Sequence, residues 1–116
     1  MVYVRRQRYA EAERELRQAL EDQERTWGPA HRQLIEIYAA LGALYAMTSR
    51  VAQADTMYRR GIQVADASLV PSHPYRVAIR KAYANHLRAT KRNGIADSVE
   101  RNMPFDPSRI PIFVVP

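Results

Sequence analysis

Four side chains in the second half of the chain could hold an anionic group. Lys81, Arg88 and Arg92 stand at i, i+7 and i+11, a spacing that places them on one stripe of a helix, with Asn85 beside them. Ammonium, guanidinium and amide N–H groups all donate hydrogen bonds to carboxylates and phosphates. The stripe therefore predicts either a site for an acidic ligand or a basic face that contacts only water.

The charges of the chain are distributed unevenly. The 116 residues carry a net charge of +6, the first third holds seven of the twelve acids, and residues 67–96 hold none. A basic surface attracts acidic peptides, nucleic acid or anionic lipid. Composition does not distinguish these ligands, so binding of nucleic acid or another polyanion through residues 76–92 is an alternative to a protein partner.

No combination of residues indicates catalysis. No nucleophile stands with a base in a recognisable motif, and no glycine-rich phosphate loop occurs. His31 and His73 lack a second ligand at i+3 or i+4, which favours a structural role at a helix start over a metal site. The absence of cysteine excludes disulfides and thiolate chemistry and fits a reducing compartment. We therefore expect no enzyme, no metal and no cofactor.

One shift aligns the chain with itself. A shift of 42 residues preserves small and large positions alike: it moves Tyr9, Ala12, Leu16, Ala19 and Leu20 onto Val51, Ala54, Tyr58, Gly61 and Ile62, and His31 onto His73. Residues 31–65 form the one complete unit, with apolar side chains at three- and four-residue steps in both halves. Its first half is apolar nearly all round and must be covered on several sides. Tyr38, Tyr45 and Tyr58 fall at buried positions. An all-α fold of paired helices follows.

The shift also divides the chain. We expect a partial repeat at 1–26, a full repeat at 31–67, a terminal repeat at 73–103 and a Pro-rich apolar tail at 104–116. In the partial repeat, Met1 to about Arg6 is the last turn of a first helix, and Tyr9 to about Arg25 is the second helix. The tail is expected to lie back on the last helices, because a repeat stack needs its terminal face covered.

Local signals place the helix ends and the core of the terminal repeat. Gly28 can take a positive φ at the end of a helix, and Ser72 is a candidate N-cap before Pro74. The terminal repeat is expected to form helices at about 74–91 and 95–102. Its core candidates are Val77, Ala78, Ala82, Ala84 and Leu87.

Two motifs resemble the tetratricopeptide repeat: Leu41-Gly42-x-x-Tyr45 and Ala54-x-x-x-Tyr58-x-x-Gly61. The 42-residue period, with residues 27–31 before the helix, resembles the longer-linker variety of kinesin light chains and many bacterial regulators. The resemblance covers residues 1–103. It implies a right-handed solenoid of antiparallel helix hairpins, about two and a half repeats long. It also implies a module that binds a peptide or helix in a concave groove, as the C-terminal part of a larger bacterial-type regulatory or scaffold protein.

The resemblance also implies where a ligand would bind. Lys81 and Asn85 match positions that often hold a peptide's carboxylate, but Ala39 and Ala43, one repeat earlier, cannot donate hydrogen bonds. The resemblance thus implies half of a carboxylate clamp. The expected groove residues are Lys81, Asn85, Arg88, Arg92, Glu36 and Ala43.

Three further expectations concern the ends of the stack and the location of the protein. Glu100 replaces the large residue found at Leu16 and Tyr58, so the last helix should pack loosely or form a polar cap. With the first helix incomplete, Leu16, Leu20 and Tyr9 should be partly uncovered, so the chain is either the C-terminal end of a longer protein or self-associates through that face. No apolar run is long enough to span a bilayer and no signal peptide is recognised, so we expect a soluble, cytoplasmic protein.

Overall fold

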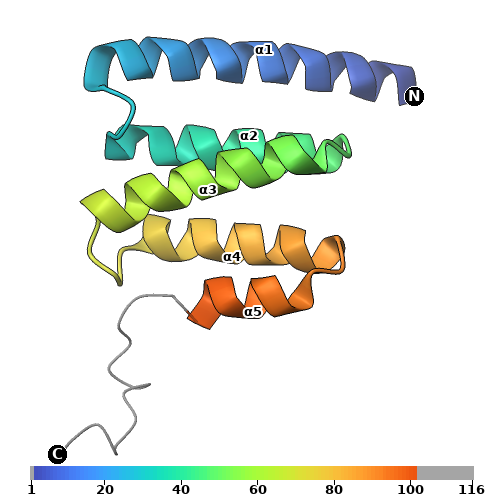
Figure 1. Cartoon of the computed structure of the whole chain (residues 1–116). Helices are drawn as coiled ribbons and strands as arrows, with labels where there is room; N and C mark the ends of the chain where they lie inside the picture. The colour runs from blue at the N-terminus through green and yellow to red at the C-terminus, as the bar shows by residue number, and fades with distance from the viewer. Residues whose placement is uncertain (1, 102–116) are drawn as a thin grey trace, which may run out of the picture.

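A stack of helices makes up the part of the chain that the structure describes. The structure is a computed structural model, and it describes residues 2–101, with side chains from residue 7. Figure 1 shows the helices stacked in chain order, consecutive ones running in opposite directions. The elements are α1 (Val2–Trp27), the short 3₁₀ helix η1 (Arg32–Leu34), α2 (Ile35–Met47), α3 (Val51–Ser68), α4 (Pro74–Ala89) and α5 (Asn93–Arg101). The predicted all-α class and helix-hairpin stack are confirmed.

Helix α2 is central, as its apolar sequence predicts. It packs against α1, α3 and α4, and α4 in turn pairs with α5. Tyr38, Tyr45 and Tyr58 are 3%, 1% and 3% exposed, so their predicted burial is confirmed. Each tyrosine buries a large apolar ring, and burial of such a ring stabilises the fold by about 1.5–3 kcal/mol. The core thus follows the axis of the stack.

Two glycines allow the central helices to approach each other. A Cβ atom on Gly42 would lie 2.8–2.9 Å from three ring carbons of Tyr58. A Cβ atom on Gly61 would lie 3.1 Å from Cβ of Tyr38 and would overlap Cδ1 of Ile79. The large side chain of one helix therefore fills the space left by the small residue of its neighbour.

The two histidines at equivalent helix starts act as N-caps. Nδ1 of His31 accepts a hydrogen bond from the backbone N–H of Gln33, and Nδ1 of His73 accepts one from Tyr75, both at 3.1 Å. Their predicted structural role is confirmed. The predicted cap at Ser72 is wrong: His73 holds the cap position, and Pro74 follows it as the first helical residue.

The turns inside the two hairpins have the same backbone conformation. Ser49 and Lys91, which the 42-residue shift superimposes, both have φ of 62°. The equivalent Gln7 lies inside the continuous helix α1, so the predicted break after about Arg6 is wrong. Residues 2–9 contain no glycine, proline or asparagine that would end a helix. Gly28, as predicted, has a positive φ of 86° where α1 ends.

The terminal repeat differs from its prediction in detail. Ala84 and Leu87 are buried as expected, but Ala78 is exposed, and Val77 and Ala82 are only partly buried. Ile79 and Tyr83 occupy the core instead. Alanine fits either face of a helix, so the larger side chains decide which face is buried. The predicted packing of the tail concerns residues outside the described part of the chain.

The glycine contacts generate a stability prediction. Gly42→Ala should lower the free energy of unfolding by about 1–2 kcal/mol, because overpacking against the Tyr58 ring outweighs the better helix propensity of alanine. Urea denaturation followed by circular dichroism measures this change. Gly94→Ala is the matched control: its Cβ would meet no atom within 4 Å, so it should be neutral or stabilising by up to about 1 kcal/mol. Equal effects of the two substitutions would contradict the close-approach explanation.

Candidate functional site

Two arginines of the basic segment pair with one acid of the neighbouring hairpin. Nε of Arg76 lies 3.0 Å from Oδ1 of Asp66, and Arg80 binds the other oxygen of that carboxylate. Arg80 is 7% exposed and also donates to the carbonyl of Val99 at 3.1 Å. Their guanidinium groups join α4 to α3 and α5 and are not available as a free basic face.

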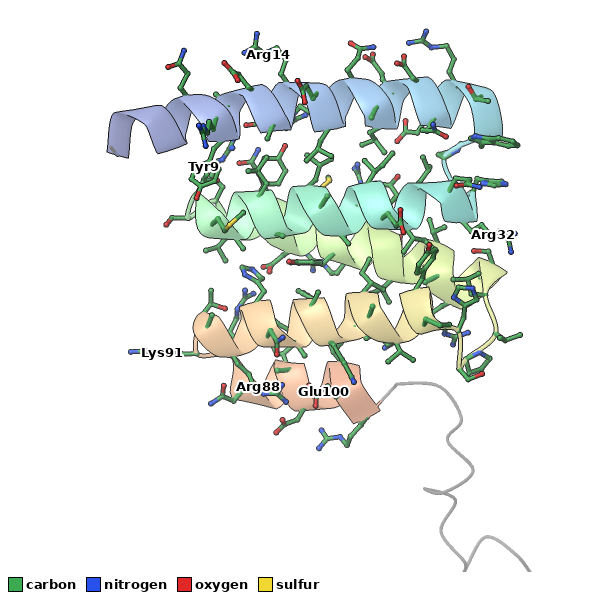
Figure 2. All side chains as sticks on the ribbon, turned by 180° about the vertical axis from the view of Figure 1, so that it is seen from behind. Tyr9, Arg14, Arg32, Arg88, Lys91 and Glu100 are labelled. Atoms are coloured by element: carbon green, nitrogen blue, oxygen red, sulfur yellow. The ribbon has the colours of Figure 1, made fainter. Side chains whose placement is uncertain are left out.

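Arg88, one of the predicted groove residues, is held by the last helix. It donates to Oε1 of Glu100 at 2.6 Å and to Oδ1 of Asp97 at 3.1 Å, and Figure 2 labels Arg88 and Glu100 close to each other at the α4–α5 pair. These hydrogen bonds explain why α5 carries Glu100 at a position that is apolar in the other repeats. The predicted polar cap has this ion pair as its physical basis, while Ala96 of the same helix is fully buried.

Arg92, another predicted groove residue, lies beyond the end of α4 and not on its stripe. Helix α4 ends at Ala89 and not near residue 91, and the chain turns through Lys91. Arg92 donates to both oxygens of Asp55 on α3, at 2.7 and 2.9 Å. Nε2 of His86, a buried residue, lies 3.0 Å from the same carboxylate. The expected single stripe of Lys81, Arg88 and Arg92 is therefore wrong.

The Arg92 contact repeats one made 42 residues earlier. Arg50 donates to the two carboxylate oxygens of Glu13 at 2.6 and 3.2 Å. Nε of Arg50 donates to Thr48 at 3.2 Å, and Nε of Arg92 donates to Thr90 at 2.9 Å. We call each such acid–arginine pair an inter-repeat link, because it joins the second helix of one repeat to the hairpin turn of the next.

The links shift the pKa values of their acids. Two-point hydrogen bonding by Arg50 lowers the pKa of Glu13 to about 2, although partial burial opposes the shift. Burial of Asp55 raises its pKa, but the hydrogen bonds and charge of Arg92, with His86, outweigh burial and leave the pKa below its usual value. Both acids are therefore ionised at neutral pH, so both links are ion pairs.

The remaining predicted site residues belong to two helices, Glu36 and Ala43 to α2 and Lys81 and Asn85 to α4. Helices α2 and α4 pack directly against each other. Glu36, Lys81 and Asn85 are exposed and Ala43 is half-buried; no ion pair of residues 7–101 includes Lys81. A hydrogen bond from Tyr75 of α4 to Glu36 of α2 raises the pKa of the Tyr75 phenol. We call the surface of Glu36, Ala39, Ala43, Met47, Ala78, Lys81 and Asn85 the α2–α4 face.

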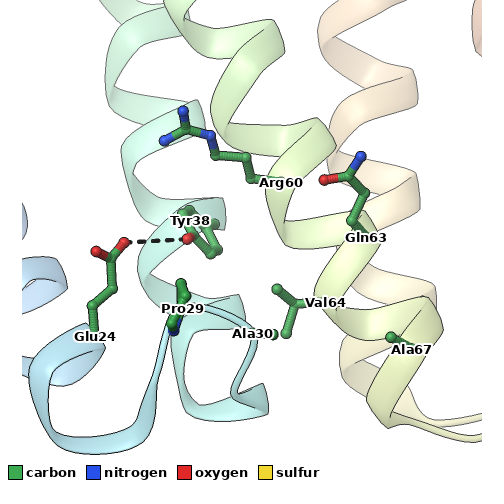
Figure 3. A pocket seen from close by; sticks show the side chains of 8 residues that line it. All are labelled: Glu24, Pro29, Ala30, Tyr38, Arg60, Gln63, Val64 and Ala67. Atoms are coloured by element: carbon green, nitrogen blue, oxygen red, sulfur yellow. Dashed lines mark hydrogen bonds between the residues drawn. The ribbon is translucent and has the colours of Figure 1, made fainter.

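A cavity that the sequence analysis missed lies on another side of the stack. Its volume is about 450 Å³, and the hydroxyl of Tyr38 in its wall donates to Glu24 at 3.4 Å (Figure 3). It is lined by Glu24, Pro29, Ala30, Tyr38, Arg60, Gln63, Val64 and Ala67. The lining comes from three helices and a loop, with no shared motif that could have revealed it.

The comparisons with known proteins give one match. The sequence pattern of the family described as tetratricopeptide repeat matches residues 1–67, which is more than half of the chain and covers α1 to α3. No curated protein and no solved structure matches the chain. Among the described residues, no helix has both the length and the apolar character that crossing a membrane requires.

The Glu13 link generates a pH prediction. The pKa of Glu13 is about 2 in the folded state against 4.5 for the ordinary residue. Its contribution to stability is therefore complete above about pH 4.5 and is lost as the pH falls towards 2. Glu13→Gln should cost about 1–3 kcal/mol at neutral pH, because Arg50 loses its charged partner.

The free energy of unfolding of Glu13→Gln should fall less steeply between pH 5 and about 2.5 than that of the unsubstituted protein. Urea titrations at each pH measure the difference. Glu21→Gln is the control on the same helix, because Glu21 is exposed and joins no ion pair of the described residues. Parallel pH profiles for the unsubstituted protein and Glu13→Gln would show that the link to Arg50 does not lower the pKa of Glu13.

Proposed function

The chain belongs to the tetratricopeptide repeat family, and from that premise we propose that it receives a peptide or a helix on the α2–α4 face. Domains of this family are in general protein-interaction modules. Stacked helices hold a binding surface in place before the ligand arrives, which lowers the entropy that binding loses. The chemistry of the ligand has to come from the side chains of the face itself.

One observation carries the proposal: Lys81 and Asn85 are exposed on α4, and both α4 and the helix packed against it, α2, carry small side chains that are not fully buried. Ala39, Ala43 and Ala78 leave room for a peptide backbone to approach the helices. The donors of Lys81 and Asn85 lie one helical turn apart, so they can bind the same carboxylate. A peptide with an acidic or free C-terminal end would satisfy both.

The other end of the face supports an apolar contact. Met47, the last residue of α2, is 60% exposed. Methionine adapts its shape to different apolar partners, and exposed methionines are common on peptide-binding surfaces. The ligand we propose therefore combines an acidic group near Lys81 with an apolar side chain near Met47. Glu36, which faces Tyr75, would disfavour a second acidic group at that point of the face.

Binding of nucleic acid or another polyanion is the alternative that the basic segment suggested. Four of its six cations, Arg76, Arg80, Arg88 and Arg92, form ion pairs with acids of the chain. A phosphate would have to compete with these carboxylates, one of which, Asp55, is buried. The geometry therefore favours a peptide ligand over a polyanion.

The test uses an array of acidic peptides with free C-terminal carboxylates, each paired with its amidated form, and measures binding by fluorescence anisotropy. We expect the free-carboxylate forms to bind more tightly. Lys81→Glu should weaken their binding at least about tenfold, or 1.4 kcal/mol. Lys91→Glu is the matched control, because it makes the same charge change at a side chain that projects away from the stack (Figure 2).

Three results would overturn the proposal. Equal losses for Lys81→Glu and Lys91→Glu would mean that net charge alone attracts the peptides. No preference for free carboxylates would remove the role of Lys81 and Asn85. Tight binding of a single-stranded oligonucleotide that weakens steeply with salt would support the polyanion alternative.

A further inference from the structure

The first helix is less well covered than the helix that the repeat superimposes on it. Ala54 and Tyr58 of α3 are 0% and 3% exposed. Their counterparts Ala12 and Leu16 of α1 are only half-buried, and Trp27, the counterpart of Leu69, is 51% exposed against 7%. The same positions of the repeat therefore lack part of their packing at this end of the stack.

The missing packing belongs to one side of α1. Among the described helices, α3 packs against both α2 and α4, whereas α1 packs only against α2 and η1. The other contact of α1 described above is the link from Glu13 to Arg50. Glu13 and Glu24 of α1 point towards α2, where they meet Tyr45 and Tyr38. Helical spacing places a half-buried strip of Ala12, Leu16, Ala19 and Gln23 to one side of these contacts, and Leu16 on its edge also packs against the core. We call this strip the α1 open face.

The charges along α1 complement each other when two such helices lie antiparallel. Residues 5–8 hold three arginines and no acid, while residues 21–24 hold Glu21, Asp22 and Glu24 and no base. In an antiparallel pair the basic start of each helix lies beside the acidic end of the other. Arg8 and Asp22 are both exposed, and helical spacing places both on the solvent side of the open face.

We propose that the α1 open face binds a second copy of this chain, with the two α1 helices antiparallel about a two-fold axis. A two-fold interface uses the same patch on both subunits, so each α1 covers the other's Leu16 and Ala19. The helix has 26 residues and is about 39 Å long, enough for a long contact. In Figure 1 it extends past the end of α2 towards the N-terminus, so part of it lies clear of the rest of the stack.

The first test is the mass of the full chain in solution, by light scattering and sedimentation at concentrations up to about 0.5 mM. We expect a dimer. Ala19→Arg places a charge in the interface and should give a monomer with unchanged circular dichroism. Arg14→Glu is the control, because Figure 2 shows Arg14 pointing away from the other helices. It should stay dimeric.

A charge exchange tests the antiparallel arrangement. Arg8→Glu and Asp22→Arg should each weaken the dimer, and the double substitution should restore it. Lys81→Glu should leave the dimer intact, so failure of this inference is distinct from failure of peptide binding on the α2–α4 face. A monomer at every concentration would overturn the proposal in favour of a different helix on this face, such as one that precedes Met1 in a longer chain. Equal effects of Ala19→Arg and Arg14→Glu would also overturn it.

Discussion

The structure depends on the carboxylate–guanidinium pairs that join one helix hairpin to the next. Each inter-repeat link ties three groups together: an acid on the second helix of a repeat, an arginine after the following hairpin turn, and the threonine of that turn, which orients the arginine. Two-point pairing of this kind sets direction as well as distance. The links therefore fix how far each hairpin is rotated on its neighbour, while the apolar core supplies most of the stabilisation.

The same links limit what the basic half of the chain can do. Asp55 and Asp66 both belong to α3, which packs against α4. Asp55 forms an ion pair with Arg92, and Asp66 forms ion pairs with Arg76 and Arg80. A net charge of +6 therefore does not correspond to one continuous basic surface. What is left on α4 is a lysine and an asparagine beside alanines, a smaller and more selective arrangement than the composition suggests. The peptide site that we propose depends on that difference.

Much of the fold could be predicted from the 42-residue shift, because it aligns each residue of one repeat with the residue that has the same place in the next repeat. The buried tyrosines and the structural role of His31 and His73 at helix starts follow from that comparison, although the cap before α4 was expected at Ser72 and is His73. The partners of Arg88 and Arg92 could not be predicted, since the contacting acids lie between 9 and 37 positions away and the packing angle decides which are reached. Ala78 was expected in the core but is exposed, because the methyl group of an alanine has little preference for either face of a helix. The continuity of α1 could not be inferred from the shift, because the shift places Gln7 on the hairpin turn at Ser49 and therefore predicts a turn there.

The junction between α1 and α2 contains the only tryptophan of the chain. The indole of Trp27, half exposed, stacks on the imidazole of His31 with 4.8 Å between ring centres. Trp27 is the last residue of α1, and His31 is the N-cap of η1, the short helix that leads into α2. The fluorescence emission of Trp27 therefore reports on a single place in the molecule. Any event that shifts the first helix against the hairpin that follows would change the surroundings of that one chromophore, so the protein carries its own optical probe for the loosening of its first layer.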